Sequence, residues 1–140
     1  QAAEIRKIAD VVIVKSIPLG GVNAALKIVE EIGLPTVVSG SLDTSVGLAS
    51  GLQLAGCIEN LYGACGLGTG LLLDGDVVEH SLLPVNGHIP IGRVKPDEEC
   101  LARWQPRGNQ VFEWSERLIR AWNASAIHLV SDEVREAVQA

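Results

Sequence analysis

Lys15 is the residue of this sequence best placed to do chemistry, because it is the only charged residue between Asp10 and Lys27. It lies near the end of the apolar run 11–17, and a buried ammonium is costly unless it is paired. Ligands of parallel α/β sheets and barrels bind at the carboxyl ends of the strands. We therefore interpret Lys15 as a functional residue at a ligand site, where desolvation suits a lysine to proton transfer. The simpler interpretation is a lysine that extends from the strand end into water.

A polar segment at residues 39–45 supplies the second candidate. Ser39, Gly40 and Ser41 follow an apolar run and offer hydroxyl and backbone N–H groups to an anionic ligand. The same residue types are also typical of turns, so both interpretations stay open. Asp43 is the only charge in this region, and we predict that it caps the helix that follows.

Two further groups carry weaker signals. Gly66 and Gly68 let a backbone pass close to a ligand, but their spacing matches neither a dinucleotide fingerprint nor a P-loop. Residues 74–80 (DGDVVEH) loosely resemble a metal site but lack EF-hand or zincin spacing, which favours a solvated loop. The cysteines are odd in number and far apart, which argues against a disulfide framework or zinc site and favours a reducing cytosol: Cys57, Cys65 and Cys100. No metal ligand is predicted.

The elements that must position these residues are alternating strands and helices. Residues 11–17 form a β-branched run without period-two alternation, which is typical of a strand buried on both faces of a parallel sheet. Residues 35–41 and 61–67 predict a second and a third strand. Apolar residues at helical spacing in 22–32, and small residues in 44–58, predict the two helices between the strands. Consecutive units of this kind build a parallel α/β sheet.

The regular pattern stops after the third strand. Residues 74–90 predict a loop, and 88–94 an edge strand, because Pro90 cannot donate to a ladder. Ser131 is predicted to cap a short final helix. Before it, apolar residues at helical spacing predict an amphipathic helix whose stripe we interpret as packing: Val111, Trp114, Leu118 and Trp122.

Composition bounds the class of protein. The net charge of −6 argues against a nucleic-acid surface, which needs clustered cations. No uncharged stretch reaches the ~20 apolar residues of a membrane span, so we expect a soluble, cytoplasmic chain without a membrane partner. We place a boundary between 1–76, the sheet and its helices, and 77–140, the loop, edge strand and helical tail. The 140 residues hold no Met, not even at position 1, which predicts a cut upstream.

Three motifs together resemble a known family. They are VIVKSIPLGG at 12–21, PTVVSGSLDTSVG at 35–47 and ACGLGTG at 64–70. In this order, each on a predicted strand end, they resemble o-succinylbenzoate synthase of the actinobacterial type, in the enolase superfamily. The resemblance runs from about residue 8 to residue 76.

The resemblance implies a capping domain plus a modified (β/α)8 barrel, in which the three predicted strands are the sixth to the eighth. It implies a Mg²⁺-dependent dehydration of a cyclohexadiene carboxylate in menaquinone biosynthesis. Lys15 is similar to the sixth-strand lysine that stabilises the enediolate. Ser39, Gly40 and Ser41 resemble the segment that meets the succinyl side chain of the substrate, and Gly66 and Gly68 match a turn that lines the same pocket.

Several parts of the family's site have no counterpart in this sequence. The second catalytic lysine, in a KxK motif, and the three acidic Mg²⁺ ligands belong to earlier strands. Three parallel strands cannot close a barrel and leave exposed edges. We therefore expect the chain to need the N-terminal barrel half and capping domain as partners, and to be inactive and poorly behaved as a monomer alone.

Two alternatives stay open at this stage. The chain is also compatible with another enolase-superfamily enzyme, such as an N-succinylamino acid racemase or a muconate lactonising enzyme. The absence of an acid at 65–68 weighs against a lactonising role. From a different class, the chain could be a non-catalytic half-barrel module whose strand ends hold an anion.

Overall fold

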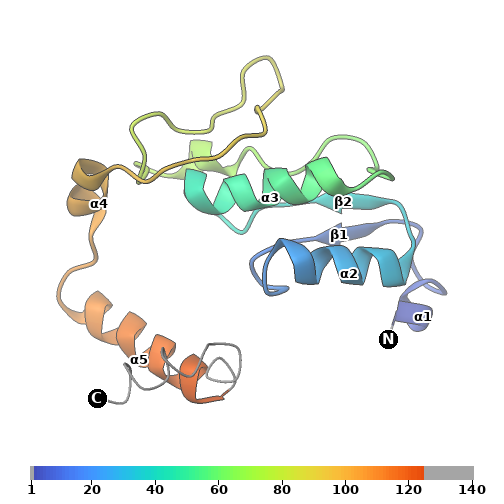
Figure 1. Cartoon of the computed structure of the whole chain (residues 1–140), viewed down its shortest axis with the longest axis horizontal. Helices are drawn as coiled ribbons and strands as arrows, with labels where there is room; N and C mark the ends of the chain where they lie inside the picture. The colour runs from blue at the N-terminus through green and yellow to red at the C-terminus, as the bar shows by residue number, and fades with distance from the viewer. Residues whose placement is uncertain (1, 125–140) are drawn as a thin grey trace. The chain divides into compact units, whose positions relative to one another are not determined.

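The computed structural model describes residues 2–124, so the predicted cap at Ser131 lies outside the described residues. Contacts divide the chain into two compact units, which meet in sequence between Trp104 and Gln105. The predicted boundary after residue 76 stays a prediction. The elements of the first unit, in chain order, are α1 (Ala2–Ile5), β1 (Val12–Val14), α2 (Val22–Ile32), β2 (Thr36–Val38), α3 (Ser45–Cys57), the 3-10 helix η1 (Thr69–Leu72) and α4 (Glu98–Trp104) (Figure 1).

The sheet at the centre of the first unit is parallel, as predicted. β1 and β2 pair in the register Val12↔Thr36, and β2 pairs onward with the segment predicted as a third strand. That segment makes only two isolated parallel bridges, Thr36↔Leu61 and Ser39↔Gly66, rather than a continuous strand. The six residues from Leu61 to Gly66 face only the four residues from Thr36 to Ser39. The two extra residues form a bulge, in which Gly63 has a φ of 69°.

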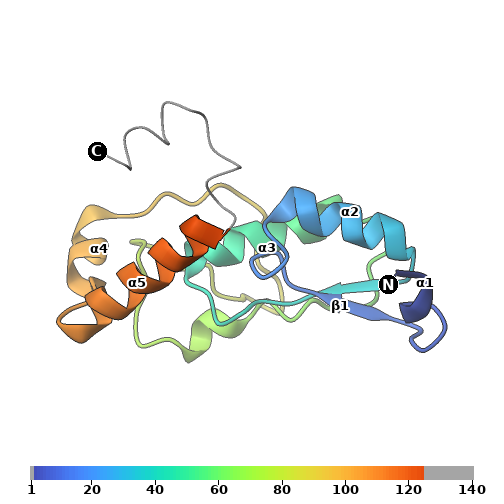
Figure 2. The ribbon, with the colours of Figure 1, turned by 90° about the horizontal axis from the view of Figure 1, so that it is seen from below.

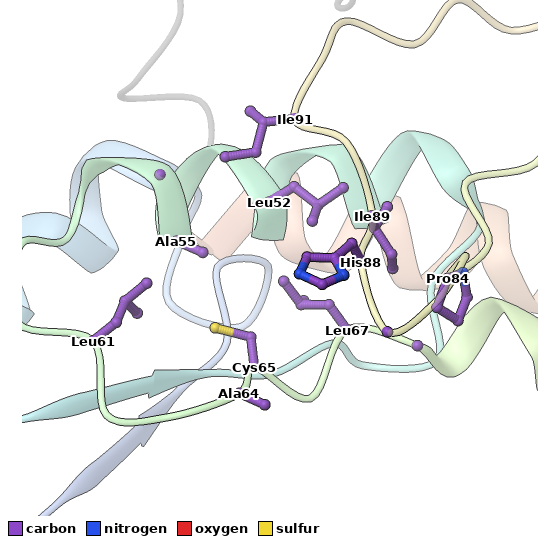
Figure 3. A pocket seen from close by; sticks show the side chains of 13 residues that line it. Leu52, Ala55, Leu61, Ala64, Cys65, Leu67, Pro84, His88, Ile89 and Ile91 are labelled. Atoms are coloured by element: carbon purple, nitrogen blue, oxygen red, sulfur yellow. The ribbon is translucent and has the colours of Figure 1, made fainter.

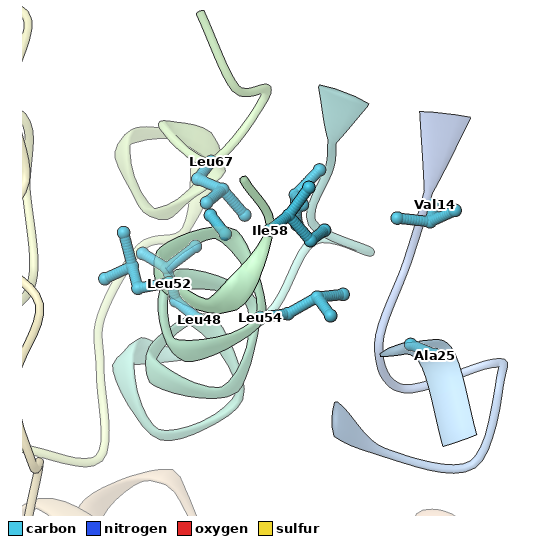
Figure 4. Packing of buried hydrophobic residues seen from close by; sticks show 9 residues of the cluster. Val14, Ala25, Leu48, Leu52, Leu54, Ile58 and Leu67 are labelled. Atoms are coloured by element: carbon cyan, nitrogen blue, oxygen red, sulfur yellow. The ribbon is translucent and has the colours of Figure 1, made fainter. Parts of the chain in front are cut away.

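The two predicted helices are confirmed, and their apolar faces cover one side of the sheet (Figure 2). α2 ends at Gly33, whose φ of 66° suits glycine and whose N–H donates to the Val29 carbonyl at 2.8 Å. Small residues let α3 approach closely, since a Cβ on Gly51 would lie 2.8 Å from Leu67 Cδ2. The core gathers between these helices and the strands (Figure 4): Val14, Ala25, Val38, Leu48, Leu52, Leu54, Ala55, Ile58 and Leu67.

The opposite side of the sheet is open. Val14 is 5% exposed and Val38 is fully buried, but Ile13, which lies between Val12 and Val14, is 69% exposed. The prediction of a strand buried on both faces is therefore wrong for the described part of the chain. The reason is geometric: α2 and α3 follow right-handed crossovers and lie on the same side of the sheet.

Downstream of the sheet, the structure differs from the sequence prediction in two places. Residues 88–94 form no strand in the described chain; instead, Val85 and His88 make a single antiparallel bridge. Asn86 and Gly87 both have positive φ, 51° and 77°, which closes a tight turn between them. α4 was not predicted, and it begins where the Asp97 carboxylate accepts the Cys100 N–H at 2.9 Å.

The second unit contains α5 (Asn109–Ala124), which includes the predicted amphipathic helix. Within this unit, Trp114 and Leu118 of the stripe are more than half accessible, and the interpretation of the stripe as packing stays a prediction. Arg117 lies over the Trp114 ring, 5.1 Å from its centroid, and shields part of it. Within residues 2–124, no helix combines the length and the apolar character that crossing a membrane requires.

Candidate functional site

Lys15 directly follows β1 and is held by the end of β2. Its Nζ donates to Ser39 Oγ at 3.2 Å and to the Gly40 carbonyl oxygen. Because the strands are parallel and adjacent, their carboxyl ends place these groups side by side. The ammonium is thus half-buried and held by two acceptors, rather than extended into water.

Two glycines bring a third segment to the same place. The Gly40 N–H donates to the Gly66 carbonyl at 2.9 Å, and the Gly66 N–H donates to the Val38 carbonyl at 2.8 Å. A Cβ on Gly66 would lie 3.2 Å from Ser39 Oγ, tighter than an ordinary contact. The structure therefore brings four of the predicted site residues together at the strand ends: Lys15, Ser39, Gly40 and Gly66.

The backbone beyond Gly40 makes a strained turn. The Ser41 N–H donates to Asp43 Oδ2 at 2.7 Å, which closes the turn around Leu42. Leu42 has a φ of 66°, a left-handed conformation that costs an L residue roughly 1–2 kcal/mol. The predicted capping of α3 by Asp43 is wrong, since its carboxylate faces Ser41 and α3 has no side-chain cap from Thr44 either.

The N-terminus of α3 is held by Asp76, from a loop predicted to be solvated. The Ser45 N–H donates to Asp76 Oδ1 at 3.0 Å, the Ser45 hydroxyl donates to Oδ2, and the Val77 N–H donates to Oδ1 at 2.8 Å. Ser45 Oγ in turn accepts the Leu82 N–H at 2.7 Å. Nothing local in the sequence signals this contact, because 31 residues separate its partners.

These hydrogen bonds decide the charge state of Asp76. Partial burial disfavours the ionised carboxyl, but the bonds from Ser45 and Val77 together outweigh it and hold the pKa of Asp76 below its ordinary value. Elsewhere in the same loop, Glu79 and His80 are exposed, as a solvated loop predicts. Asp76 is therefore ionised at neutral pH and serves as a fixed acceptor.

Gly68 lies at an apolar cavity on the helix side of the sheet. The cavity has a volume of about 600 Å³ and is apolar; α3, the stretch 61–68 and the turn around Gly87 enclose it (Figure 3). Its lining includes Gly68, Cys65 and His88, whereas Gly66 is not among the lining residues. Lys15, Ser39 and Gly40 are not among its lining residues either, so this cavity is distinct from the cluster around Lys15.

The described residues do not fit a metal ion. Among residues 2–124 there is no group of three His, Cys, Asp or Glu side chains arranged to hold one. Asp76, the acid with the most buried position in the loop, already accepts hydrogen bonds from Ser45 and Val77. The three cysteines are free thiols. The chemistry of this cluster is therefore that of a held cation beside the Ser39 hydroxyl.

Comparison with known proteins gives the cluster a context. The chain is 51% identical to the o-succinylbenzoate synthase of Thermobifida fusca over 106 residues, which is 71% of this chain and 33% of the relative. It is 48% identical to the Mycobacterium leprae enzyme of the same name and 46% identical to that of Mycobacterium tuberculosis, each over 89 residues, 64% of this chain and 26% and 27% of the relatives. No protein-family model matches. The predicted resemblance is confirmed: this chain is a relative of o-succinylbenzoate synthases that spans between a quarter and a third of their length.

Proposed function

We propose that this chain supplies the strand-end lysine and part of the substrate pocket of an o-succinylbenzoate synthase. The reaction is the dehydration of a succinyl-hydroxycyclohexadiene carboxylate to o-succinylbenzoate, a lyase step in menaquinone biosynthesis. One observation carries the proposal: the Lys15 ammonium is held by Ser39 and Gly40 at the strand ends, in a chain 51% identical to an enzyme of that name.

Lys15 would act as a fixed positive charge. A lysine ammonium has three N–H donors, and Ser39 Oγ and the Gly40 carbonyl use two of them. The third is free to donate to a substrate oxygen. When the α-proton of a carboxylate is removed, negative charge grows on the carboxylate oxygens, and a donor already in position stabilises that charge without reorganising.

The neighbouring residues would hold the remote part of the substrate. Ser39 carries its hydroxyl beside Lys15, the exposed Ser41 follows Gly40 in the chain, and Gly66 lies against Ser39. We assign these residues to the succinyl side chain, with Gly68 at the turn beyond. The barrel fold of the relatives, with these strands as its sixth to eighth, is part of the same proposal.

The remaining parts of the site would come from elsewhere. Mg²⁺ would supply further positive charge to the substrate carboxylate, but the described residues do not form its site. Its ligands, the proton-abstracting base and the capping domain would therefore belong to an N-terminal barrel half acting as partner. By itself, the chain would be inactive.

A chimera tests the proposal. Residues 2–104 of this chain replace the matching part of the Thermobifida fusca enzyme, and dehydration is assayed. We expect an active chimera in which Lys15→Ala lowers kcat by about 100-fold or more, as loss of one charge-stabilising donor does. The matched control is Lys27→Ala, an exposed lysine on α2, which should leave kcat unchanged.

Two outcomes would contradict the proposal. An inactive parent chimera would show that this chain does not supply a working part of the site. Near-normal activity of Lys15→Ala would show that the lysine has no such role. Racemisation of an N-succinylamino acid in place of dehydration would favour the alternative enzyme of the superfamily.

A further inference from the structure

The segment from Ser39 to Ser45 is anchored at both ends by different parts of the molecule. At its start, the Ser39 N–H donates to the Val14 carbonyl at 2.9 Å, and Gly40 is bonded to Gly66. At its end, Ser45 is 2% exposed, and both its N–H and its hydroxyl bind Asp76. The sheet therefore holds one end of this segment, and Asp76 holds the other.

The middle of the segment shows why a second anchor is needed. Leu42 has a positive φ and is more than half exposed, so burial of its side chain does not stabilise that conformation. Strained backbone of this kind persists only where the surroundings enforce it. The Ser41–Asp43 bond closes the turn locally, and the bond from Ser45 to Asp76 fixes the chain where the segment enters α3.

We propose that Asp76 is a positioning residue, which holds the segment from Ser39 to Ser45 in the shape that receives the substrate side chain. This inference deepens the proposed function and rests on it for the identity of the substrate. Asp76 touches neither Lys15 nor its two acceptors; it acts through Ser45. Ser39 and Gly40 stay bonded to the sheet without it.

This division predicts a specific kinetic signature in the active chimera. Asp76→Ala should raise KM by about tenfold, because the binding segment loses its second anchor. The same substitution should leave kcat within about threefold of the parent value, because Lys15 keeps both of its hydrogen-bond acceptors. Asp76→Asn keeps a carbonyl acceptor, so its KM should lie between those of the parent and Asp76→Ala. A general loss of stability would not produce this partial recovery.

The matched control is Asp97→Ala. Asp97 also accepts an N–H at the start of a helix, that of Cys100 in α4, but it has no bond to the segment from Ser39 to Ser45. Its loss should leave both KM and kcat unchanged. If Asp97→Ala and Asp76→Ala change KM equally, the effect is general loss of stability and the positioning role is overturned.

Hydrogen exchange gives a readout that does not depend on activity. The peptide that covers residues 39–48 should exchange at least about tenfold faster in Asp76→Ala than in the parent or in Asp97→Ala. Unchanged exchange in that peptide would overturn the positioning role even if the parent chimera is active. An inactive parent with faster exchange in Asp76→Ala would instead leave the positioning role standing and remove the proposed function.

Discussion

The two faces of the small sheet differ sharply. On the helix side, Val14 and Val38 are buried to 5% and 0% exposure, whereas Ile13 on the other side is 69% exposed. Strand alternation places Lys15 on the same side as Ile13, and Ser39 on the same side as Val37. The covered face therefore holds the fold together, and the open face carries the candidate site.

The comparison teaches where stability and function separate in this chain. The covered face is completed by α2 and α3, which follow directly in the sequence. The open face has apolar residues but no cover among the described residues, in a chain that spans between a quarter and a third of the length of its relatives. Substitutions on the two faces should therefore have very different consequences for folding.

The largest effect should come from the covered face. Leu54→Ala removes a fully buried side chain of α3 from the core and should lower the free energy of unfolding by about 2–5 kcal/mol. Urea-induced unfolding of the dilute 140-residue chain, followed by circular dichroism, measures this change. Leu71→Ala, the same substitution at a residue that is 63% exposed, is the control and should cost less than about 0.5 kcal/mol. Equal effects would mean that the described core does not hold the chain together.

A smaller effect should come from the polar contact at the start of α3. Asp76→Asn removes a charged acceptor there and should cost about 0.5–2 kcal/mol at pH 7, as loss of a helix-end acceptor does. The folded-state pKa of Asp76 lies below its ordinary value of 3.8, so its stabilisation is fully present well above pH 3.8 and is lost as the pH falls through the folded-state pKa.

The measurement for Asp76 is urea unfolding of the same chain at pH 7 and at several values below 4. The difference between the parent and Asp76→Asn should shrink as the pH falls. A difference that stays constant down to the most acidic pH would show that the charge of Asp76 does not stabilise the fold.

The smallest effect should come from the open face. Ile13→Thr replaces an exposed side chain and should change the free energy of unfolding of the dilute chain by less than about 0.5 kcal/mol. Val14→Thr places a hydroxyl in the core one residue along and should cost about 1–3 kcal/mol. If the two variants are equally destabilised, the open face is covered in solution and the contrast between the faces is wrong.

Much of the fold follows from local patterns. The periodic apolar residues and the glycine stop define α2, and the β-branched runs define β1 and β2. Two further features also have local signals in the sequence: the Asn86-Gly87 pair closes a turn, and Asp97 with its acidic neighbours begins α4. Residue types alone are enough to predict both.

Other features depend on residues far apart in the sequence. Residues 61–67 were predicted as a strand but make only isolated bridges. This difference becomes visible only when the length of that segment is compared with the length of the β2 segment that it faces. The exposure of Ile13 depends on which side both helices pack, since a β-branched run looks the same whether or not its second face is covered.

The candidate site shows the same division. Residue types and strand ends pointed to Lys15, Ser39 and Gly40, because parallel strands place their carboxyl ends at one edge, and the family resemblance added Gly66. Only the tertiary structure decided that Asp76, and not Asp43, holds the start of α3. Ser45 and Asp76 are 31 residues apart, so their hydrogen bond forms only because the folded chain returns to the start of α3. Local sequence patterns do not predict such a return.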